Sequence, residues 1–171
     1  MKRIGDDLLL DALKQREDYV QGAANAIDTK ASQTIAAAAI LAVQPAALLL
    51  ASSIPAPAIV VQLIGYVIIC VALYFSHCAL DVRDYPSPGF PKDWFLDVKK
   101  QIPPNCSDED VRESMVWALI HQAEGRVEEG RQVNEQRLEA LRKARKAVTV
   151  ALITNLSAFV ITAVTRVFSS H

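Results

Sequence analysis

The distribution of charged residues divides the chain into apolar and polar segments. Between Lys30 and Asp81 the sequence contains no Asp, Glu, Lys or Arg. A helix that crosses a bilayer needs about 20 apolar residues, so this stretch has room for two such helices and a turn. Prolines at 55 and 57 favour a turn at 52–57, because proline lacks a backbone donor. The pattern predicts a membrane hairpin of helices 31–51 and 58–80. A soluble helical hairpin is the alternative, but it would show a polar face.

The N-terminal segment, residues 1–30, has the spacing of an amphipathic helix. Its apolar residues recur at three- and four-residue steps: Leu9, Leu13, Val20, Ala23 and Ile27. Acidic residues at 6, 7 and 11 are wrong for a signal peptide. No proline separates this segment from residue 31, so we expect one continuous rod with the first span.

A long helix is predicted from Ser107 onward, after the proline-rich connection 81–106. Ser107 suits the N-cap position, and Asp110 is placed to bond back to it. Apolar, glycine and asparagine positions then form a seam at three- and four-residue steps: Val116, Ile120, Ala123, Val127, Gly130, Asn134, Leu138, Leu141, Ala144 and Val148. This seam predicts packing against other helices along residues 107–146.

The same helix is expected to continue into a third membrane span within 147–168. Residues 147–165 are uncharged and lie between the basic block 142–146 and Arg166. The basic block places residues 1–30 and 81–146 in the cytoplasm by the positive-inside rule. The fold class predicted is therefore an all-α membrane protein with a two-helix hairpin and a long cytoplasmic helix that continues into a third span.

Polar residues inside the predicted spans have two interpretations. Gln44, Pro45 and Asn155 either line a pore or gate, or they represent a tolerated kink and hydrogen bonds between helices. At the inner boundary, Asp28 faces the basic block, and we expect an ion pair with Arg145. The alternative is an ordinary solvated carboxylate.

A short segment between the two proline clusters, residues 92–100, combines aromatic and basic side chains. It suits an anchor in the membrane interface, where tryptophan and lysine are favoured. It also suits a small-ligand pocket, in which an aromatic ring stacks on a base and a lysine meets a phosphate. The residues concerned are Trp94, Phe95, Lys99 and Lys100.

Composition narrows the classes of function. The formal net charge of −1 is against a protein that binds nucleic acid by neutralising phosphates. The three cysteines lack the spacing of a metal or redox motif, so we expect reduced thiols and no metal. Histidines, serines and acids do not gather into a catalytic arrangement, and no glycine-rich phosphate loop is present. We expect no enzyme activity and no cofactor.

Two stretches resemble a known family. The string Asn25-Ala-Ile-Asp-Thr-Lys-Ala-Ser32, which opens the first predicted span, resembles the A-D-x-K-A-S motif of the membrane-spanning effectors of Pycsar anti-phage systems, with Ile27 in place of the usual alanine. The segment from Asn134 to Lys146, a polar position followed by a basic run, is similar to the final helix of that family. Related two-span effectors beside other nucleotide-second-messenger defence genes have a similar layout.

The resemblance implies a multi-pass effector of the bacterial inner membrane that impairs this membrane after a cyclic nucleotide signal. Its implied partners are lipid, a cyclic nucleotide and further copies of itself. The apolar seam of the long helix also predicts a homo-oligomer. The alternative function is a passive membrane scaffold or small subunit that recruits a partner through its long cytoplasmic helix.

Overall fold

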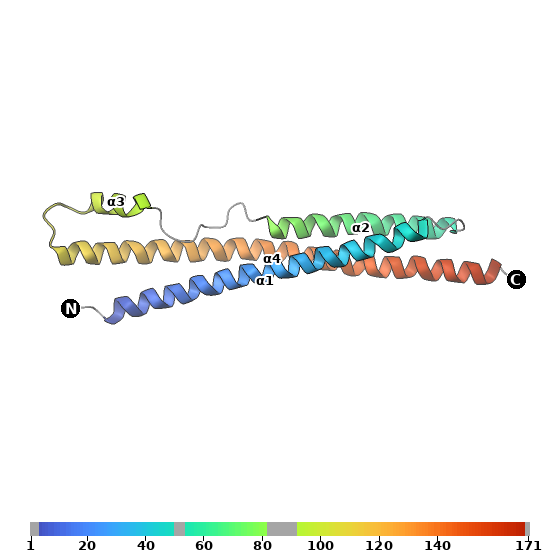
Figure 1. Cartoon of the computed structure of the whole chain (residues 1–171), viewed down its shortest axis with the longest axis horizontal. Helices are drawn as coiled ribbons and strands as arrows, with labels where there is room; N and C mark the ends of the chain where they lie inside the picture. The colour runs from blue at the N-terminus through green and yellow to red at the C-terminus, as the bar shows by residue number, and fades with distance from the viewer. Residues whose placement is uncertain (1–3, 50–53, 82–91, 170–171) are drawn as a thin grey trace. The chain divides into compact units, whose positions relative to one another are not determined.

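The computed structural model describes residues 4–49, 54–81 and 92–169. These residues form four helices and no strand: α1 (Ile4–Leu49), α2 (Ala56–Leu80), α3 (Lys92–Gln101) and α4 (Asp108–Ser169) (Figure 1). The prediction of an all-α chain is confirmed over this part. The short helix α3 lies within the connection that the sequence marks by its prolines.

The two long helices are continuous where the sequence predicted continuity. α1 runs through Gly22 and Lys30 and stays helical past Pro45. α4 runs from its acidic first turn through the basic block into the apolar C-terminal segment. No proline lies within α4, so nothing in its sequence removes a backbone donor or ends the helix before Ser169.

Local chemistry explains the starts of α2 and α4. Pro55 is extended and precedes α2, and Pro57 lies in the first turn, where the missing N–H costs nothing. At α4, the Asp110 amide donates to Ser107 Oγ over 3.2 Å, and the Ser107 amide donates to Asp110 Oδ2 over 3.2 Å. This reciprocal pair is a capping box and confirms the predicted start.

The chain divides into two compact units, and α1 and α4 contribute to both. Unit 1 contains residues 1–24 and 83–135, and unit 2 contains residues 25–82 and 136–171. In unit 1, Asn134 Nδ2 donates to the Val20 carbonyl over 2.9 Å. Arg126 Nη2 forms an ion pair with Glu17 Oε1 at 3.7 Å. These contacts tie the N-terminal parts of α1 and α4 together.

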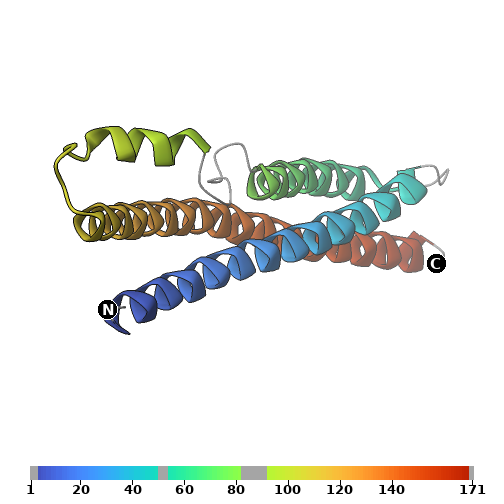
Figure 2. The same ribbon diagram turned by 60° about the vertical axis from the view of Figure 1, so that its left-hand side comes forward.

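Unit 2 consists of three helical segments packed side by side, with α1 and α4 parallel and α2 antiparallel to them (Figures 1 and 2). Buried positions of α2 follow alternating steps of four and three residues: Ala58, Gln62, Gly65, Ile69, Ala72, Ser76 and Ala79. The α1 and α4 segments show the same repeat. Such a seven-residue period is that of coiled-coil packing.

Two clusters of buried residues hold unit 2 together. The first contains Ile27, Ala31, Ala79 and Leu141. The second contains Ala38, Leu41, Ile69 and Ala151. Both draw on α1, α2 and α4, and alanine is the commonest residue in them. Small side chains allow the three backbones to approach closely.

Many other large apolar side chains of unit 2 lie on its outside. Exposed examples on α2 and α4 are Val60, Leu63, Ile64, Val67, Leu152, Ile153, Leu156, Phe159 and Val160. Buried positions include the polar residues Thr34, Gln62, Ser76, Asn155 and Thr162. The distribution is inverted relative to a water-soluble coiled coil, in which large apolar residues fill the seam.

In the described residues, two helices are long and apolar enough to cross a membrane, α2 and α4. They contain the second and third predicted spans. Residues 31–49 of the first predicted span, 31–51, lie in α1, and the side chains from residue 44 onward are outside the described part. It stays a prediction.

Candidate functional site: polar contacts between the helices of unit 2

Arg137 joins all three helices of unit 2. Its side chain is buried, and its residue is 3% exposed. Nε donates to the Ala79 carbonyl over 2.7 Å, and the guanidinium forms an ion pair with Asp28. Ala79 lies in the last turn of α2, where carbonyls lack an amide partner within the helix. Arg137 therefore caps α2 and neutralises a carboxylate of α1 at the same point.

The expected partner of Asp28 was Arg145, and this assignment was wrong. Asp28 does form an ion pair, but with Arg137, two turns earlier on α4. The seven-residue repeat explains the difference, since Arg137 and Ala144 occupy inward positions while Arg145 is exposed. The partner of Asp28 is therefore an inward-facing residue of α4 and not a residue of the basic block 142–146.

A second polar contact lies deeper in the apolar part and centres on Asn155. In an α-helix the amide of residue 45 would donate to the carbonyl of Leu41, but Pro45 has no N–H. Asn155 Nδ2 of α4 donates to this Leu41 carbonyl over 3.3 Å. Asn155 thus replaces the donor that proline removes from α1.

α2 contributes to the same contact from the other side. The Tyr66 hydroxyl donates to the Ala42 carbonyl over 3.1 Å, and Gln62 Nε2 donates to Asn155 Oδ1 over 3.5 Å. Two successive carbonyls one turn before Pro45 therefore accept from neighbouring helices. A proline in a membrane helix is tolerated when neighbours satisfy the carbonyls that it frees.

These contacts bear on the predicted polar residues at membrane depth. Asn155 is 7% exposed and bonds to helices of its own chain, which favours the hydrogen-bonding interpretation for this residue. The side chains of Gln44 and Pro45 are outside the described part. Sequence reasoning did not assign Gln62 and Tyr66 to this site, although each is a polar group within an apolar helix.

The absence of a side chain at Gly65 of α2 leaves room for Asn155. A Cβ atom added to Gly65 would lie 2.8 Å from Asn155 Oδ1 and 3.6 Å from Thr154 Cγ2. The first distance is too short for any side chain without a shift. Glycine here allows the asparagine to reach α1.

Gly65→Ala is expected to lower the free energy of unfolding by about 1 kcal/mol, because the new methyl group displaces the Asn155 amide. Gly22→Ala is the matched control, since Gly22 is helical with nothing within 4 Å of an added Cβ. That change should raise stability by up to about 1 kcal/mol through helix propensity. Thermal unfolding in detergent, followed by circular dichroism, measures both. Equal effects of the two substitutions would contradict the close contact.

Hydroxyl groups of the apolar part are mostly satisfied by their own helix. Side chains that donate to the carbonyl four residues earlier are Thr34, Thr149, Thr154, Ser157, Thr162 and Thr165. Each such bond hides a polar group that would otherwise be costly in lipid. The threonines of the C-terminal segment therefore add less polarity than their number suggests.

The predicted ligand residues lie on α3. Trp94 is half-buried, and Lys100 Nζ forms an exposed ion pair with Asp97 at 2.9 Å. The side chains of Phe95 and Lys99 are outside the described part. A ligand pocket or a membrane anchor at this helix stays a prediction.

On the outer face of α4 in unit 1, Arg131 lies between two acids. Its guanidinium donates to Glu128 over 2.7 and 2.9 Å, and it also pairs with Glu135. The hydrogen bond from Arg131, and then that from Gln132, lowers the pKa of Glu128 to about 2. Glu128 therefore stays ionised at physiological pH. The group is solvent-exposed, so this pair contributes little to stability.

The potential metal ligands and the cysteines are scattered over the described part of the chain. No group of three or more His, Cys, Asp or Glu residues there could hold a metal ion. Cys70, Cys78 and Cys106 are free thiols. Comparisons with protein-family models, with curated proteins and with solved structures found no match. The geometry defines a helical protein with two helices long and apolar enough to cross a membrane.

Proposed function

We propose that the chain is a multi-pass membrane effector, which impairs the bacterial inner membrane when a cyclic nucleotide signal acts on its cytoplasmic part. The observation that carries the membrane location is the inverted burial of unit 2. Small and polar side chains make up most of its interior, together with Ile27, Leu41, Ile69 and Leu141, whereas most of its other leucine, isoleucine, valine and phenylalanine side chains lie on its surface. In water such an apolar surface would favour aggregation, whereas a protein surrounded by lipid is expected to have it.

The packing of unit 2 supports a third span in α1. Ala38 and Leu41 share a cluster with Ile69 of α2 and Ala151 of α4. These two partners lie well inside the apolar segments of their helices. If α2 and α4 cross a membrane, the paired part of α1 lies at the same depth.

The charges that flank the apolar segments support one membrane boundary. Lys30 precedes the apolar segment of α1, Asp81 follows α2, and Lys146 precedes the apolar segment of α4. The cluster of Ile27, Ala31, Ala79 and Leu141 brings the three boundaries together. The basic block at this end supports a cytoplasmic location for it by the positive-inside rule.

The continuity of α1 and α4 supports a route from signal to membrane. Each helix contributes residues to unit 1 and continues without a break into unit 2. A ligand that changes the pairing of their N-terminal parts would bias the packing of the apolar parts as well. The resemblance to Pycsar effectors supports a cyclic nucleotide as this ligand and a homo-oligomer as the active form. The passive scaffold remains the alternative function.

Cysteine labelling is expected to place residue 53 outside and Cys106 inside the cell. The variant Cys70→Ser/Cys78→Ser removes the thiols of α2, and Ser53→Cys adds a reporter in the turn between the first two predicted spans. A membrane-impermeant maleimide should then label residue 53 in intact cells and Cys106 only after permeabilisation. Labelling of both sites in intact cells would contradict the proposed topology.

Dye release from proteoliposomes tests the effector function. We expect release when one of the four common cyclic mononucleotides is added to vesicles that contain the full chain. Trp94→Ala should abolish the response if the ligand stacks on α3, while Leu96→Ala, an exposed residue of the same helix, should retain it. An inserted protein that releases no dye with any of the four would favour the scaffold.

A further inference from the structure

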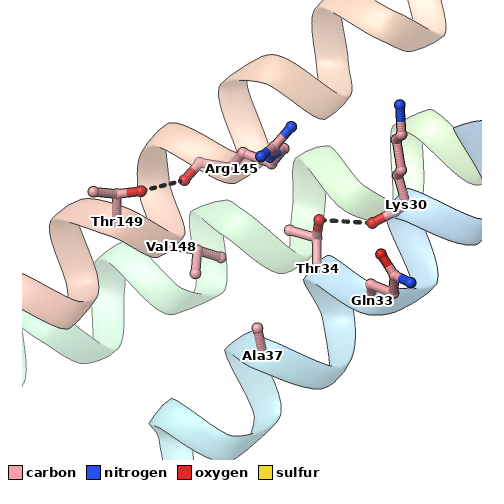
Figure 3. A pocket seen from close by; sticks show the side chains of 7 residues that line it. All are labelled: Lys30, Gln33, Thr34, Ala37, Arg145, Val148 and Thr149. Atoms are coloured by element: carbon pink, nitrogen blue, oxygen red, sulfur yellow. Dashed lines mark hydrogen bonds between the residues drawn. The ribbon is translucent and has the colours of Figure 1, made fainter.

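A groove between α1 and α4 lies at the proposed cytoplasmic boundary of unit 2. It has a volume of about 350 Å³ and is lined by Lys30, Gln33, Thr34, Ala37, Arg145, Val148 and Thr149 (Figure 3). None of these residues belongs to the polar contacts of Arg137 or Asn155. The groove therefore needs an explanation of its own.

The chemistry of the groove changes along the helix axes. Lys30 and Arg145 supply two cations at the end nearer the basic block. Gln33 follows with its amide, and the Thr34 and Thr149 hydroxyls donate to the carbonyls of Lys30 and Arg145 (Figure 3). On α1 the order along the groove is cation, polar group and apolar surface, which ends at Ala37. On α4 the apolar Val148 lies between Arg145 and Thr149 in the sequence.

The two cations have no carboxylate partner among the described residues. Asp28, the acid nearest in sequence to Lys30, is in an ion pair with Arg137. Lys143, in the same basic block as Arg145, pairs with Glu139 at 2.8 Å, so that acid is also engaged. The groove therefore carries an uncompensated positive charge at one end.

A neighbouring groove on α4 shares this chemistry. It is lined by Arg142, Arg145, Lys146, Thr149 and Val150 and has a volume of about 550 Å³. Arg145 and Thr149 belong to both grooves. Cations at one end and an aliphatic side chain at the other occur twice around the same arginine.

We infer that the groove of Lys30 and Arg145 binds the headgroup phosphate of an anionic phospholipid, with an acyl chain along Ala37 and Val148. This inference rests on the proposed membrane location. Basic pockets between helices on the cytoplasmic side of a membrane suit anionic headgroups. A soluble phosphate ester would meet the same cations but would leave the apolar end of the groove unused.

Lipid enrichment in nanodiscs tests the inference. The full chain is reconstituted in equal amounts of phosphatidylglycerol and phosphatidylcholine, and native mass spectrometry measures the ratio of the two lipids retained. We expect enrichment of phosphatidylglycerol on the unchanged chain. Lys30→Gln/Arg145→Gln should reduce it by about fivefold for each charge removed. Circular dichroism in phosphatidylcholine alone checks that the variant folds.

Lys143→Gln is the matched control for the single variant Arg145→Gln, because each removes one charge from the same block and Lys143 lines neither groove. Enrichment within twofold of the unchanged chain supports a built site. An equal loss in this control would mean diffuse attraction only and would overturn the inference. The inference would also be overturned if the unchanged chain showed no preference for phosphatidylglycerol, or if millimolar inorganic phosphate displaced the lipid. A chain that does not enter nanodiscs would contradict the proposed function as well.

Discussion

Arg137→Leu is expected to lower the free energy of unfolding by about 3 kcal/mol. The substitution leaves the Ala79 carbonyl at the end of α2 without a donor and Asp28 without its counter-charge. Breaking a buried ion pair from one side costs about 3–5 kcal/mol. The Asp28 side chain is 44% exposed, so water compensates part of the loss and the lower end applies. Unfolding in detergent with a denaturant measures the change.

Arg145→Leu is the control for this prediction. Arg145 is exposed on the same helix, and an exposed charge contributes at most about 1 kcal/mol. The double variant Asp28→Asn/Arg137→Leu should be less destabilised than the sum of its single changes, because each single change removes the same ion pair. Equal losses for Arg137→Leu and Arg145→Leu would show that Arg137 does not hold the three helices.

Asn155→Leu is expected to lower the free energy of unfolding by about 2 kcal/mol when Pro45 is present. The change strands the Leu41 carbonyl and the Gln62 amide, and each unsatisfied buried group costs about 1–3 kcal/mol. In a Pro45→Ala background the amide of residue 45 can donate to Leu41 within α1. The loss caused by Asn155→Leu should therefore be about 1 kcal/mol smaller there.

Thr154→Val gives the matched comparison, since its hydroxyl donates only to the Val150 carbonyl of its own helix. This substitution should have little effect in either background. The double-mutant cycle of residues 45 and 155 isolates the coupling between them. A coupling energy near zero would contradict the role of Asn155 as the replacement donor.

The helices and most of their limits could be predicted because their signals are local. Prolines mark the break before α2, and the pair Ser107 and Asp110 marks the start of α4. The apolar periods identified α1 and α4 as long continuous helices. These features depend on neighbours within a few residues, and such neighbours are visible in one sequence.

The inward position of Arg137 could not be predicted in the same way. The steps of three and four residues predicted Leu138 in the seam of α4, between Asn134 and Leu141. Leu138 does pack partly against the first cluster, but the fully buried neighbour is Arg137. The buried guanidinium of Arg137 is stabilised by the Ala79 carbonyl of α2. The periodicity of α4 gives no information about this carbonyl.

The contact between Asn155 and Leu41 was hidden for a related reason. The sequence marks Pro45 as a predicted kink and Asn155 as a polar residue in an apolar segment. They are far apart in the sequence, and only the parallel packing of α1 and α4 brings them to one level. Asn155 of α4 supplies the hydrogen-bond donor that Pro45 removes from α1.

The order of synthesis gives these long-range contacts a further consequence. The contacts of α1 with α4 join residues 109 to 114 positions apart, whereas Tyr66 reaches Ala42 across only 24. At a synthesis rate of about 5–20 residues per second, these residues of α4 are made roughly 5–20 s after the residues of α1 that they contact. During that interval Tyr66 can already donate to the Ala42 carbonyl. Leu41 and Asp28 gain their partners only when Asn155 and Arg137 have been made. These contacts of α1 are therefore complete only after α4 has been made.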